Sequence, residues 1–590
     1  MKSLHLHLRL LLFAAAAFFA LGMNPAFAQA PLEPAQLPSR TVFYLIWRGA
    51  PPADVRKANS LMALWDDPDF APVRSAIASN ILSSSQEKSP NQKLTPEELQ
   101  EYASLLENGF TAGYIGEPPK RSAASAPASK DAKAPAWNGM FFVYDRTGKE
   151  TLIAKAILRM RAQQKEAPVL TPLVIAGVPV LKAEIKNATT YWADQGKFAI
   201  SAGERSVMEQ ILGRLNGKSP ATASLAQSSA YQAAQPILGS GVLEFFVGVP
   251  DLKELASDSN AGGFKARPLL EAARLDAIQS IGGHLALEGS KTHMQAAIFG
   301  DTAPGTPFDI WPASPATPVS LAFAPADAVS YSAGQINFMG IYGIVKRIAQ
   351  AAFPQGQQGN ADMLDTIAAA RIGMRLADAL SLPTGEFASM QTSPSLETAK
   401  QVYFLGIRKK PETLKLMRAL FSDQLASERD EGEVTFLKIS LGGRQANAGV
   451  AQWNFFNVAV TPDMMIGATR ADTLREVLAN RSKGPAAAGL STVPQFQASR
   501  TKFPENLNSM SYFDFQKVDW QGLRDRLVAE SKKNSVAKSL GPAKKPPASA
   551  GMNLDWLTQV NAQVFSRHLH YSTGVSWKDS KGIHWDQWLE

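Results

Sequence analysis

The sequence predicts an α+β fold in which two tandem copies of one unit each form a mostly antiparallel sheet covered by helices. Two observations lead to this prediction. Apolar strands, helices and turns that begin near Pro38 recur in the same order from near Pro325, and both series end in a β-hairpin. Strands joined by short turns or single helices favour antiparallel pairing, although the strand-helix-strand order around Lys149 leaves one parallel pair open.

Each copy opens with an apolar strand after a proline. The first strand reaches Tyr44 and the second reaches Tyr331, an offset of 331 − 44 = 287. Helices follow in both copies, and the first copy adds one at Thr95–Glu98, where the spacing forms a capping box. The other expected helices are Ala53–Trp65 and Phe70–Ser83 in the first copy, and Ile341–Ala352 and Met363–Leu380 in the second.

A strand that runs into a helix comes next in both copies. Met140–Val143 leads to Lys149–Leu152, and Val402–Leu405 leads to Pro411–Leu414. Farther on, each copy has a strand before a helix whose apolar residues recur every three or four positions, which predicts a buried stripe. The strands are Phe198–Ala202 and Met464–Ala468; the stripes are Val207, Met208, Ile211, Leu212 and Leu215 in the first copy, and Leu474, Val477 and Leu478 in the second.

Both copies close in the same way. A helix that starts with aromatic-glutamine-alanine, at Tyr231 or Phe496, precedes a strand, Val242–Val249 or Met510–Val518. The final hairpins, Gly283–His293 and Gly574–His584, align without a gap. The expected organisation is a signal peptide (1–28), a first repeat unit (36–300) with a flexible insertion (118–136), a Pro-rich linker (301–318) and a second repeat unit (319–590) with a flexible insertion (531–549).

The N-terminus has the pattern of an export signal. Lys2 and Arg9 form a basic start, Leu10–Leu21 is apolar, and Ala26-Phe27-Ala28 is an A-x-A cleavage site. The apolar run is shorter than the roughly 20 residues that a membrane span needs. We therefore expect cleavage after Ala28 and a periplasmic or secreted protein without an integral membrane segment after cleavage.

The positive charge of the chain lies in its low-complexity segments. The net charge is +8, and removal of Lys2 and Arg9 leaves 8 − 2 = +6. Residues 118–136 and 531–549 carry 3 + 5 = +8, so the rest of the chain is near 6 − 8 = −2. Nucleic acid is therefore not an expected partner, because its binding needs a basic patch on a folded surface. The sequence has no cysteine, which excludes disulfides, thiol nucleophiles and thiolate metal sites.

Segments that resemble catalytic motifs each lack an essential part. Asp145–Lys149 resembles the end of a phosphate-binding loop, but Val143 stands where the first glycine belongs and Glu150 replaces the hydroxyl residue. We interpret this segment as a strand-to-helix turn. Two S-x-x-K strings, Ser85–Lys88 and Ser535–Lys538, have only Lys291-Thr292-His293 as an approach to a K-T-G element, and we attribute them to composition.

Acids and histidines give two further candidates. Asp66, Asp67 and Asp69 lie beside Trp65, a combination that could serve calcium or glycoside chemistry, although Asp-Pro also signals a turn. His568 and His570 are expected on one strand face, about 7 Å apart, whereas His584 is expected near Val575 and roughly 16 Å from His570. No metal site is expected from the three. His293 and His584 match in the two hairpins, which favours a framework role.

The order of elements resembles an uncharacterised family of exported bacterial proteins, domain of unknown function 3352. The resemblance rests on Pro325-Ala326-Asp327 with Tyr331, the strand Ile466-Gly467-Ala468 before Leu474 and Val477, the helix start Phe496-Gln497-Ala498, and the closing hairpin. The first copy departs from it at Pro38-Ser39-Arg40. The family brings no activity, cofactor or catalytic residue with it.

The leading functional expectation is an exported, non-catalytic binding or scaffold protein of unknown ligand. A duplicated enzyme would be expected to keep the acid, base or metal ligands of one copy, and neither copy has a recognisable set. No catalytic, cofactor-binding or metal residue is therefore expected, and the partner is an unknown protein, lipid or cell-wall ligand. Two alternatives stay open: a periplasmic carrier of an apolar, lipid-like ligand, and a cell-wall or glycan hydrolase that uses Asp66, Asp67 or Asp69.

Overall fold

The computed structural model describes residues 30–76, 101, 104–116, 139–155, 169–185, 188–217, 224–239, 241–250, 260–261, 264–312, 314–315, 317–352, 359–396, 400–440, 455–482, 489–500, 504, 506–539 and 555–590. The chain divides into two compact units: Met1–Arg267 with Ile278–Gly300 is unit 1, and Pro268–Ala277 with Asp301–Glu590 is unit 2. The expected signal peptide (1–28), the insertion 118–136 and the helix at Thr95–Glu98 lie outside the described residues.

Unit 1 is built on one antiparallel sheet. Its strands follow the order β12-β11-β8-β1-β2-β3-β7-β6-β5-β4, and each described pair of neighbours is antiparallel. The strands are β1 (Thr41–Trp47), β2 (Phe110–Ile115), β3 (Met140–Asp145), β4 (Val169–Ile175), β5 (Val178–Ile185), β6 (Ala188–Gln195), β7 (Phe198–Ala202), β8 (Leu243–Gly248), β11 (Ile278–Glu288) and β12 (Lys291–Gly300). A separate two-stranded pair consists of β9 (Asn260–Ala261) and β10 (Phe264–Lys265).

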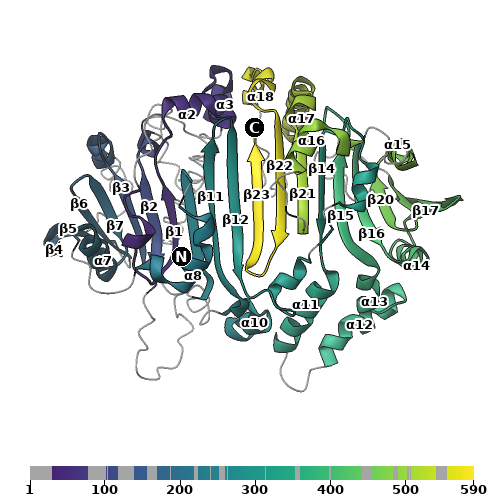
Figure 1. Cartoon of the computed structure of the whole chain (residues 1–590), viewed down its shortest axis with the longest axis horizontal. Coiled ribbons are helices and arrows are strands. Elements are labelled where there is room, and N and C mark those ends of the chain that lie inside the picture. The colour runs from purple at the N-terminus through teal and green to yellow at the C-terminus, as the bar shows by residue number, and fades with distance from the viewer. Residues whose placement is uncertain are drawn as a thin grey trace. The chain divides into compact units, whose positions relative to one another are not determined.

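Unit 2 is built on a second antiparallel sheet, with the order β23-β22-β21-β14-β15-β16-β20-β19-β18-β17. Figure 1 shows β14, β15 and β16 side by side in this unit. The strands are β14 (Ser330–Gln335), β15 (Pro383–Gln391), β16 (Gln401–Ile407), β17 (Leu425–Glu431), β18 (Val434–Ser440), β19 (Phe455–Val460), β20 (Met464–Ala468), β21 (Asn506–Asp514), β22 (Tyr571–Lys578) and β23 (Gly582–Leu589). The prediction of an α+β fold with a mostly antiparallel sheet is confirmed.

Helices lie before, between and after these strands. The main helices of unit 1 are α2 (Ala53–Ala58), α3 (Ser60–Asp66), α7 (Arg205–Leu215) and α8 (Ser229–Ala234). Those of unit 2 are α11 (Phe338–Ala352), α12 (Gly359–Ile372), α13 (Leu376–Ser381), α14 (Lys410–Leu420), α15 (Ala471–Ser482), α16 (Pro494–Arg500), α17 (Trp520–Ser539) and α18 (Gln563–His568), together with most of α10 (Ala266–Ala272).

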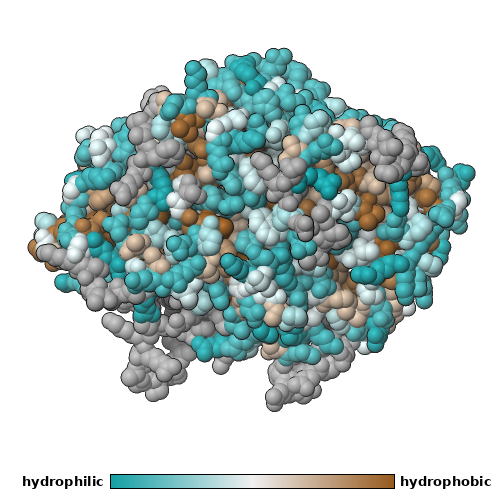
Figure 2. Space-filling model, in the orientation of Figure 1, coloured by the Kyte–Doolittle hydropathy of each residue, from teal (hydrophilic) through white to brown (hydrophobic). Residues whose placement is uncertain are grey.

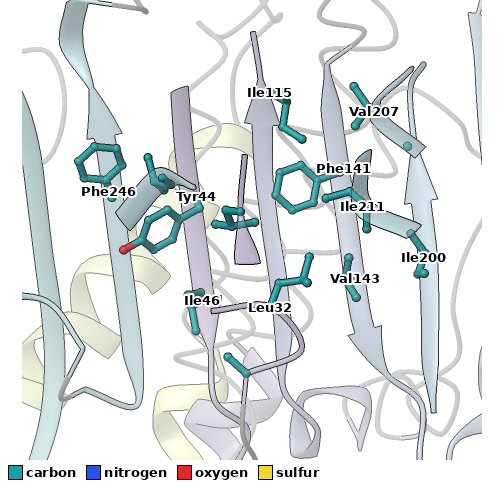
Figure 3. Packing of buried hydrophobic residues seen from close by; sticks show 14 of the residues in the cluster. Leu32, Tyr44, Ile46, Ile115, Phe141, Val143, Ile200, Val207, Ile211 and Phe246 are labelled. Atoms are coloured by element: carbon teal, nitrogen blue, oxygen red, sulfur yellow. The ribbon is translucent and has the colours of Figure 1, made fainter. Parts of the chain in front are cut away.

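One face of the unit 1 sheet carries the main core, and we call it the first face. Side chains alternate between the two faces of a strand, so Tyr44 and Ile46 of β1 lie on this face with Phe246 of β8. Figure 3 shows them beside Phe141 of β3, with Val207 and Ile211 of α7 packed over the same face. The predicted stripe of α7 is confirmed, since Val207, Met208, Ile211 and Leu212 are all buried in this cluster.

The first face of unit 2 is the one that carries Tyr331 of β14. Tyr331 and Ala333 are buried there with Met510 and Tyr512 of β21. Leu474 and Val477 of α15 and Phe496 of α16 pack in the same cluster, which also includes Phe323 of the 3-10 helix η8 (Val319–Phe323). The stripe predicted for residues 474–478 is therefore core as well.

Several predicted boundaries were wrong. The expected helix Ala53–Trp65 is interrupted at Asn59, whose side chain accepts a hydrogen bond from the Met62 N–H (3.1 Å) and so begins α3. The expected helix Met363–Leu380 is interrupted at Gly373, which has φ +70° and ends α12. The expected insertion 531–549 is helical at its start, because α17 continues to Ser539; residues 540–549 lie outside the described residues.

The Pro-rich segment 301–318, expected as a linker, belongs to unit 2 and contacts its sheet. It contains the 3-10 helix η7 (Pro307–Ile310) and β13 (Ser314–Pro315), which pairs with β21. Phe308 is buried, and its carbonyl oxygen accepts a hydrogen bond from Lys578 Nζ (3.0 Å).

The buried stripe of α7 gives a direct test of the fold. Replacing Ile211 by alanine is expected to lower the free energy of unfolding by about 2–5 kcal/mol, because the deleted side chain is fully buried. Replacing the exposed Glu209 of the same helix by alanine should change it by less than about 0.5 kcal/mol. Urea unfolding followed by circular dichroism measures both, and equal losses would contradict the assignment of this stripe to the core.

Candidate functional site

The acidic cluster near Trp65 is used for local structure. Asp66 accepts a hydrogen bond from Nε of the buried Arg56 (2.9 Å) and forms an ion pair with that guanidinium. Asp67 accepts a hydrogen bond from the Asp69 N–H (2.9 Å) and caps the 3-10 helix η2 (Pro68–Phe70). The interpretation of Asp-Pro as a turn is confirmed. These contacts place Asp66 and Asp67 in different local roles, rather than as a facing acid and base.

The segment that resembles a phosphate-binding loop is a turn after β3. Asp145 accepts hydrogen bonds from the Thr147 N–H (3.1 Å) and hydroxyl (2.6 Å), and Lys197 Nζ lies 2.8 Å from the carboxylate. Burial alone would raise the pKa of Asp145, but the hydrogen bonds from Lys197 and Thr147 lower it overall. The Thr147 N–H, which a phosphate-binding loop would offer to a phosphate, therefore donates to the Asp145 carboxylate. The interpretation of this segment as a strand-to-helix turn is confirmed.

The histidines do not lie as the sequence predicted. His568 is the last residue of α18 and not part of a strand, because β22 begins only at Tyr571. His584 pairs with Trp577 and not with Val575, since Asp579 accepts hydrogen bonds from the Lys581 and Gly582 N–H groups and tightens the hairpin turn. Among the described residues no group of three His, Asp or Glu side chains is placed to hold a metal ion.

His293 and His584 do occupy the same register in their hairpins, since His293 pairs with Ala286 and His584 with Trp577. The ring of His584 stacks on Trp577, with centroids 4.9 Å apart. The other motif fragments add no site: Thr292 is buried and donates to Asn59 (3.1 Å), Ser85–Lys88 lies outside the described residues, and Ser535–Lys538 lies within α17.

A buried polar cluster in unit 1 was missed by the sequence analysis. Glu244 of β8 is 0% exposed and accepts hydrogen bonds from the Tyr44 hydroxyl (2.5 Å) and the Gly239 N–H (2.6 Å). Arg48 donates to Glu244 (3.3 Å) and to Glu33 (3.1 Å), so one guanidinium joins both carboxylates. The available signal was a single acidic residue within the apolar strand Val242–Val249.

Burial and the charge of Glu244 set the protonation of the tyrosines in this cluster. Burial raises the pKa of Tyr44 far above its ordinary value, and the charge of Glu244 raises it further. Burial likewise raises the pKa of Tyr231 to about 12. Both phenols are protonated at neutral pH, and the Tyr44 hydroxyl donates to the buried Glu244 carboxylate.

Unit 2 satisfies its corresponding tyrosine differently. The Tyr331 hydroxyl lies 2.8 Å from Ser320 Oγ, and the carboxylate of Glu386 accepts hydrogen bonds from the N–H groups of Ser320 (2.7 Å) and Val319 (3.0 Å). Glu386 is 5% exposed and caps η8. It also lines a small pocket with Gln335, Asn508 and Ser509. Asn508 already donates to the carbonyls of Pro312 (3.0 Å) and Gln335 (3.2 Å), so the pocket is part of this framework.

The opposite side of each sheet, which we call the second face, differs between the units. In unit 1 its central residues are apolar: Phe43 and Leu45 of β1 pair with Val247 and Phe245 of β8, and with Tyr114 and Ala112 of β2. The side chains of Phe43, Leu45, Phe245 and Val247 are partly exposed. Phe142 of β3, which is 36% exposed, extends this apolar surface. Part of this face is covered near Trp47, where Leu105 and Leu106 pack.

In unit 2 the second face is rich in serine. Ser332 of β14 pairs with Ser511 of β21 and Ser389 of β15, and Ser511 pairs in turn with Gly574 of β22. Ser332 and Ser511 are exposed. Phe387 of β15 and Tyr403 of β16 are large exposed side chains on the same face, at 40% and 47%. The second faces are the parts of this fold best placed to contact a ligand, and they are the candidate functional site.

The surface in view is mostly hydrophilic, and hydrophobic residues show in separate patches (Figure 2). Every helix in the part of the chain that the structure describes is too short or too polar to cross a membrane.

Comparisons with known proteins give little to add. No protein-family model matches the chain, and no curated protein matches it. A solved structure titled "Structure of crystal form I of TP0453" has 11% sequence identity to this chain and a TM-score of 0.20. The match covers 45% of this chain and 75% of the chain in that structure.

The buried cluster around Glu244 predicts a large loss of stability when its charge balance is broken. Glu244→Ala is expected to cost about 3–5 kcal/mol, because Arg48 loses a buried counter-charge and Tyr44 a hydrogen-bond acceptor. Tyr44→Phe keeps the ring and should cost about 1–3 kcal/mol. Urea unfolding at pH 7 measures both; a loss below 1 kcal/mol for Glu244→Ala would show that the cluster is not a structural requirement.

Proposed function

We propose that the chain is an exported, non-catalytic binding protein, made of two tandem copies of one unit, that contacts its ligand through the second faces of its sheets. The single observation that carries the proposal is the contrast between the faces. The first faces hold a similar core, whereas the second faces are apolar in unit 1 and serine-rich in unit 2.

Strand order supports the tandem duplication. When β1 to β8 are matched in chain order to β14 to β21, and β11 and β12 to β22 and β23, the two strand orders correspond neighbour by neighbour. Register supports it too: Tyr44 pairs with Phe246 and Gly113, and Tyr331 pairs with Tyr512 and Met390. Pro38 and Pro325 also form equivalent isolated bridges, with Ser224 and Gly489.

The contrast between the second faces points to binding. Residues of the first face must fill a core, and a poor fit there lowers stability. Residues of the second face are only partly buried, so substitutions there are tolerated by the fold and can create a surface that binds a ligand. Sequence reasoning nominated Asp66, Asp67 and Asp69 for hydrolysis; two of the three, Asp66 and Asp67, hold Arg56 and η2 in place, which favours a binding role over a hydrolytic one.

Export is part of the proposal and rests on the N-terminal pattern that ends at Ala28. The absence of cysteine suits a protein that leaves the cytoplasm without disulfide chemistry. The resemblance to domain of unknown function 3352 agrees with export and names no ligand.

Single-cysteine cross-linking tests the role of the second faces, because the chain has no cysteine of its own. Leu45→Cys and Ser332→Cys place a photoreactive maleimide on the second faces, and Glu209→Cys places one on the exposed side of α7. In a bacterial envelope extract we expect saturable adducts from position 45, position 332 or both, and only background from position 209. The same adducts in equal yield from position 209 would contradict the proposal.

One observation favours a carrier of an apolar, lipid-like ligand as a second candidate. The second face of unit 1 presents partly exposed phenylalanine and leucine side chains on neighbouring strands, and apolar contact of this kind contributes about 1.5–3 kcal/mol per fully buried side chain.

Native mass spectrometry of the purified protein tests the carrier. If it carries lipid, Phe43→Ser with Phe245→Ser is expected to reduce the bound fraction about tenfold or more, whereas Ser511→Ala in unit 2 leaves it unchanged. A wild-type protein without bound lipid, after expression in a bacterial envelope, would rule this candidate out.

A further inference from the structure

The second face of unit 2 carries serine side chains on four neighbouring strands, β22, β21, β14 and β15, and the tyrosine Tyr403 on β16. We call it the serine surface (Figure 1 labels its strands, β22, β21, β14, β15 and β16). The pairing places its serines directly beside one another: Ser332 lies between Ser511 and Ser389, and Ser509 Oγ lies 2.6 Å from Ser576 Oγ. Its members are Ser330, Ser332, Ser389, Ser509, Ser511, Ser572 and the buried Ser576, with Phe387 and Tyr403; Phe513 lies on the same face between Ser330 and Ser572.

The fold does not require serine at these positions. When the two sheets are matched through Tyr44 and Tyr331, the residues that correspond to Ser330 and Ser332 are Phe43 and Leu45. The counterparts of Ser509 and Ser511 are likewise apolar, Leu243 and Phe245. The same backbone positions thus accept large apolar side chains. Ser509 hydrogen-bonds to the buried Ser576, whereas the exposed hydroxyl groups of Ser332 and Ser511 need an explanation other than packing.

Two aromatic rings stay exposed within this hydrophilic surface. A side chain built at Gly334 would come within 2.8 Å of Phe387 Cζ, so the Phe387 ring lies across the backbone of the neighbouring strand and is still 40% exposed. Tyr403, on the next strand, pairs with Ser389 and is 47% exposed. Phe387 and Tyr403 are diagonal neighbours on adjacent strands, and the Phe387 ring extends toward Gly334 of β14, on the side away from Tyr403.

The serine surface is also uncharged. On the second face of these five strands, within the described residues, the charged side chain is Lys578 at the end of β22, and its Nζ donates to the Phe308 carbonyl (3.0 Å). A nucleic acid, an anionic lipid or an acidic peptide would meet no compensating charge here. A neutral ligand with many hydroxyl groups would bring no charge that needs a partner on this surface.

We propose that the serine surface binds a neutral β-linked glycan chain. The C–H face of a pyranose ring stacks on an exposed aromatic ring, and Phe387 and Tyr403 are two exposed rings on this face. The serine hydroxyls both donate and accept hydrogen bonds, as the ring hydroxyls of a sugar require. This inference rests on the proposed binding function and names the ligand class for one of its two faces.

Isothermal titration calorimetry of the full chain with chitohexaose and cellohexaose tests this inference. We expect wild-type protein to bind at least one of the two. Phe387→Ala and Tyr403→Ala should each weaken binding by about two- to tenfold, the range that aromatic stacking provides. Tyr403→Phe keeps the ring and should bind nearly as wild type, which separates loss of stacking from loss of the fold.

Phe142→Ala is the matched control, because Phe142 lies at the corresponding strand position in unit 1 and is 36% exposed there. It should leave glycan binding unchanged. No binding of either hexasaccharide at millimolar concentration, or an equal effect of Phe142→Ala, would overturn the inference. The proposed binding function would survive that result if Ser332→Cys still gave saturable adducts in the cross-linking experiment, and both would fail if it did not.

Discussion

Strand register is the constraint on which the two units depend. Each sheet has a central strand, β1 or β14, held on both sides by antiparallel partners, so alternate residues must point to opposite faces. A shift of one residue would bring Phe43 or Ser330 into the core in place of the neighbouring tyrosine. The tyrosines Tyr44 and Tyr331 occupy this central position, where both rings are buried.

A buried tyrosine hydroxyl needs a hydrogen-bond partner, and each unit provides that partner from a different structural element. In unit 1 the partner is the carboxylate of Glu244 on β8, balanced by Arg48. In unit 2 it is the hydroxyl of Ser320, whose N–H donates to Glu386 of β15. A buried carboxylate without a partner would be costly, and each is matched by a guanidinium or by backbone N–H groups. The two units therefore meet the same physical requirement with different partners.

The sequence could predict what repeats locally. Alternation gave the strands around Tyr44 and Tyr331, and three-and-four spacing gave the stripes at Ile211 and Val477, because both patterns lie within a few neighbouring residues. It could not predict the Tyr44–Glu244 contact, whose partners lie 200 positions apart. His568 was wrongly placed on a strand, since two histidines two residues apart fit the end of a helix as well as a strand.

The serine surface could have been predicted in part. Residues Ser330-Tyr331-Ser332-Ala333 alternate serine with buried side chains, a strand with one hydrophilic face. What sequence alone could not provide is that Ser509, Ser511 and Ser389, from strands far apart in the chain, lie beside them. The proposed binding role of the serine surface depends on that juxtaposition.

The most direct test of the account is the unfolding free energy of two adjacent substitutions on β14, Ser332→Leu and Ala333→Leu. Ser332 is exposed on the second face and Ala333 is 1% exposed on the first. The account predicts a change within about 0.5 kcal/mol for Ser332→Leu, since unit 1 has leucine there, and a loss of about 1–3 kcal/mol for Ala333→Leu from overpacking. Equal losses would contradict the claim that one face is fixed by the core while the other is free to vary.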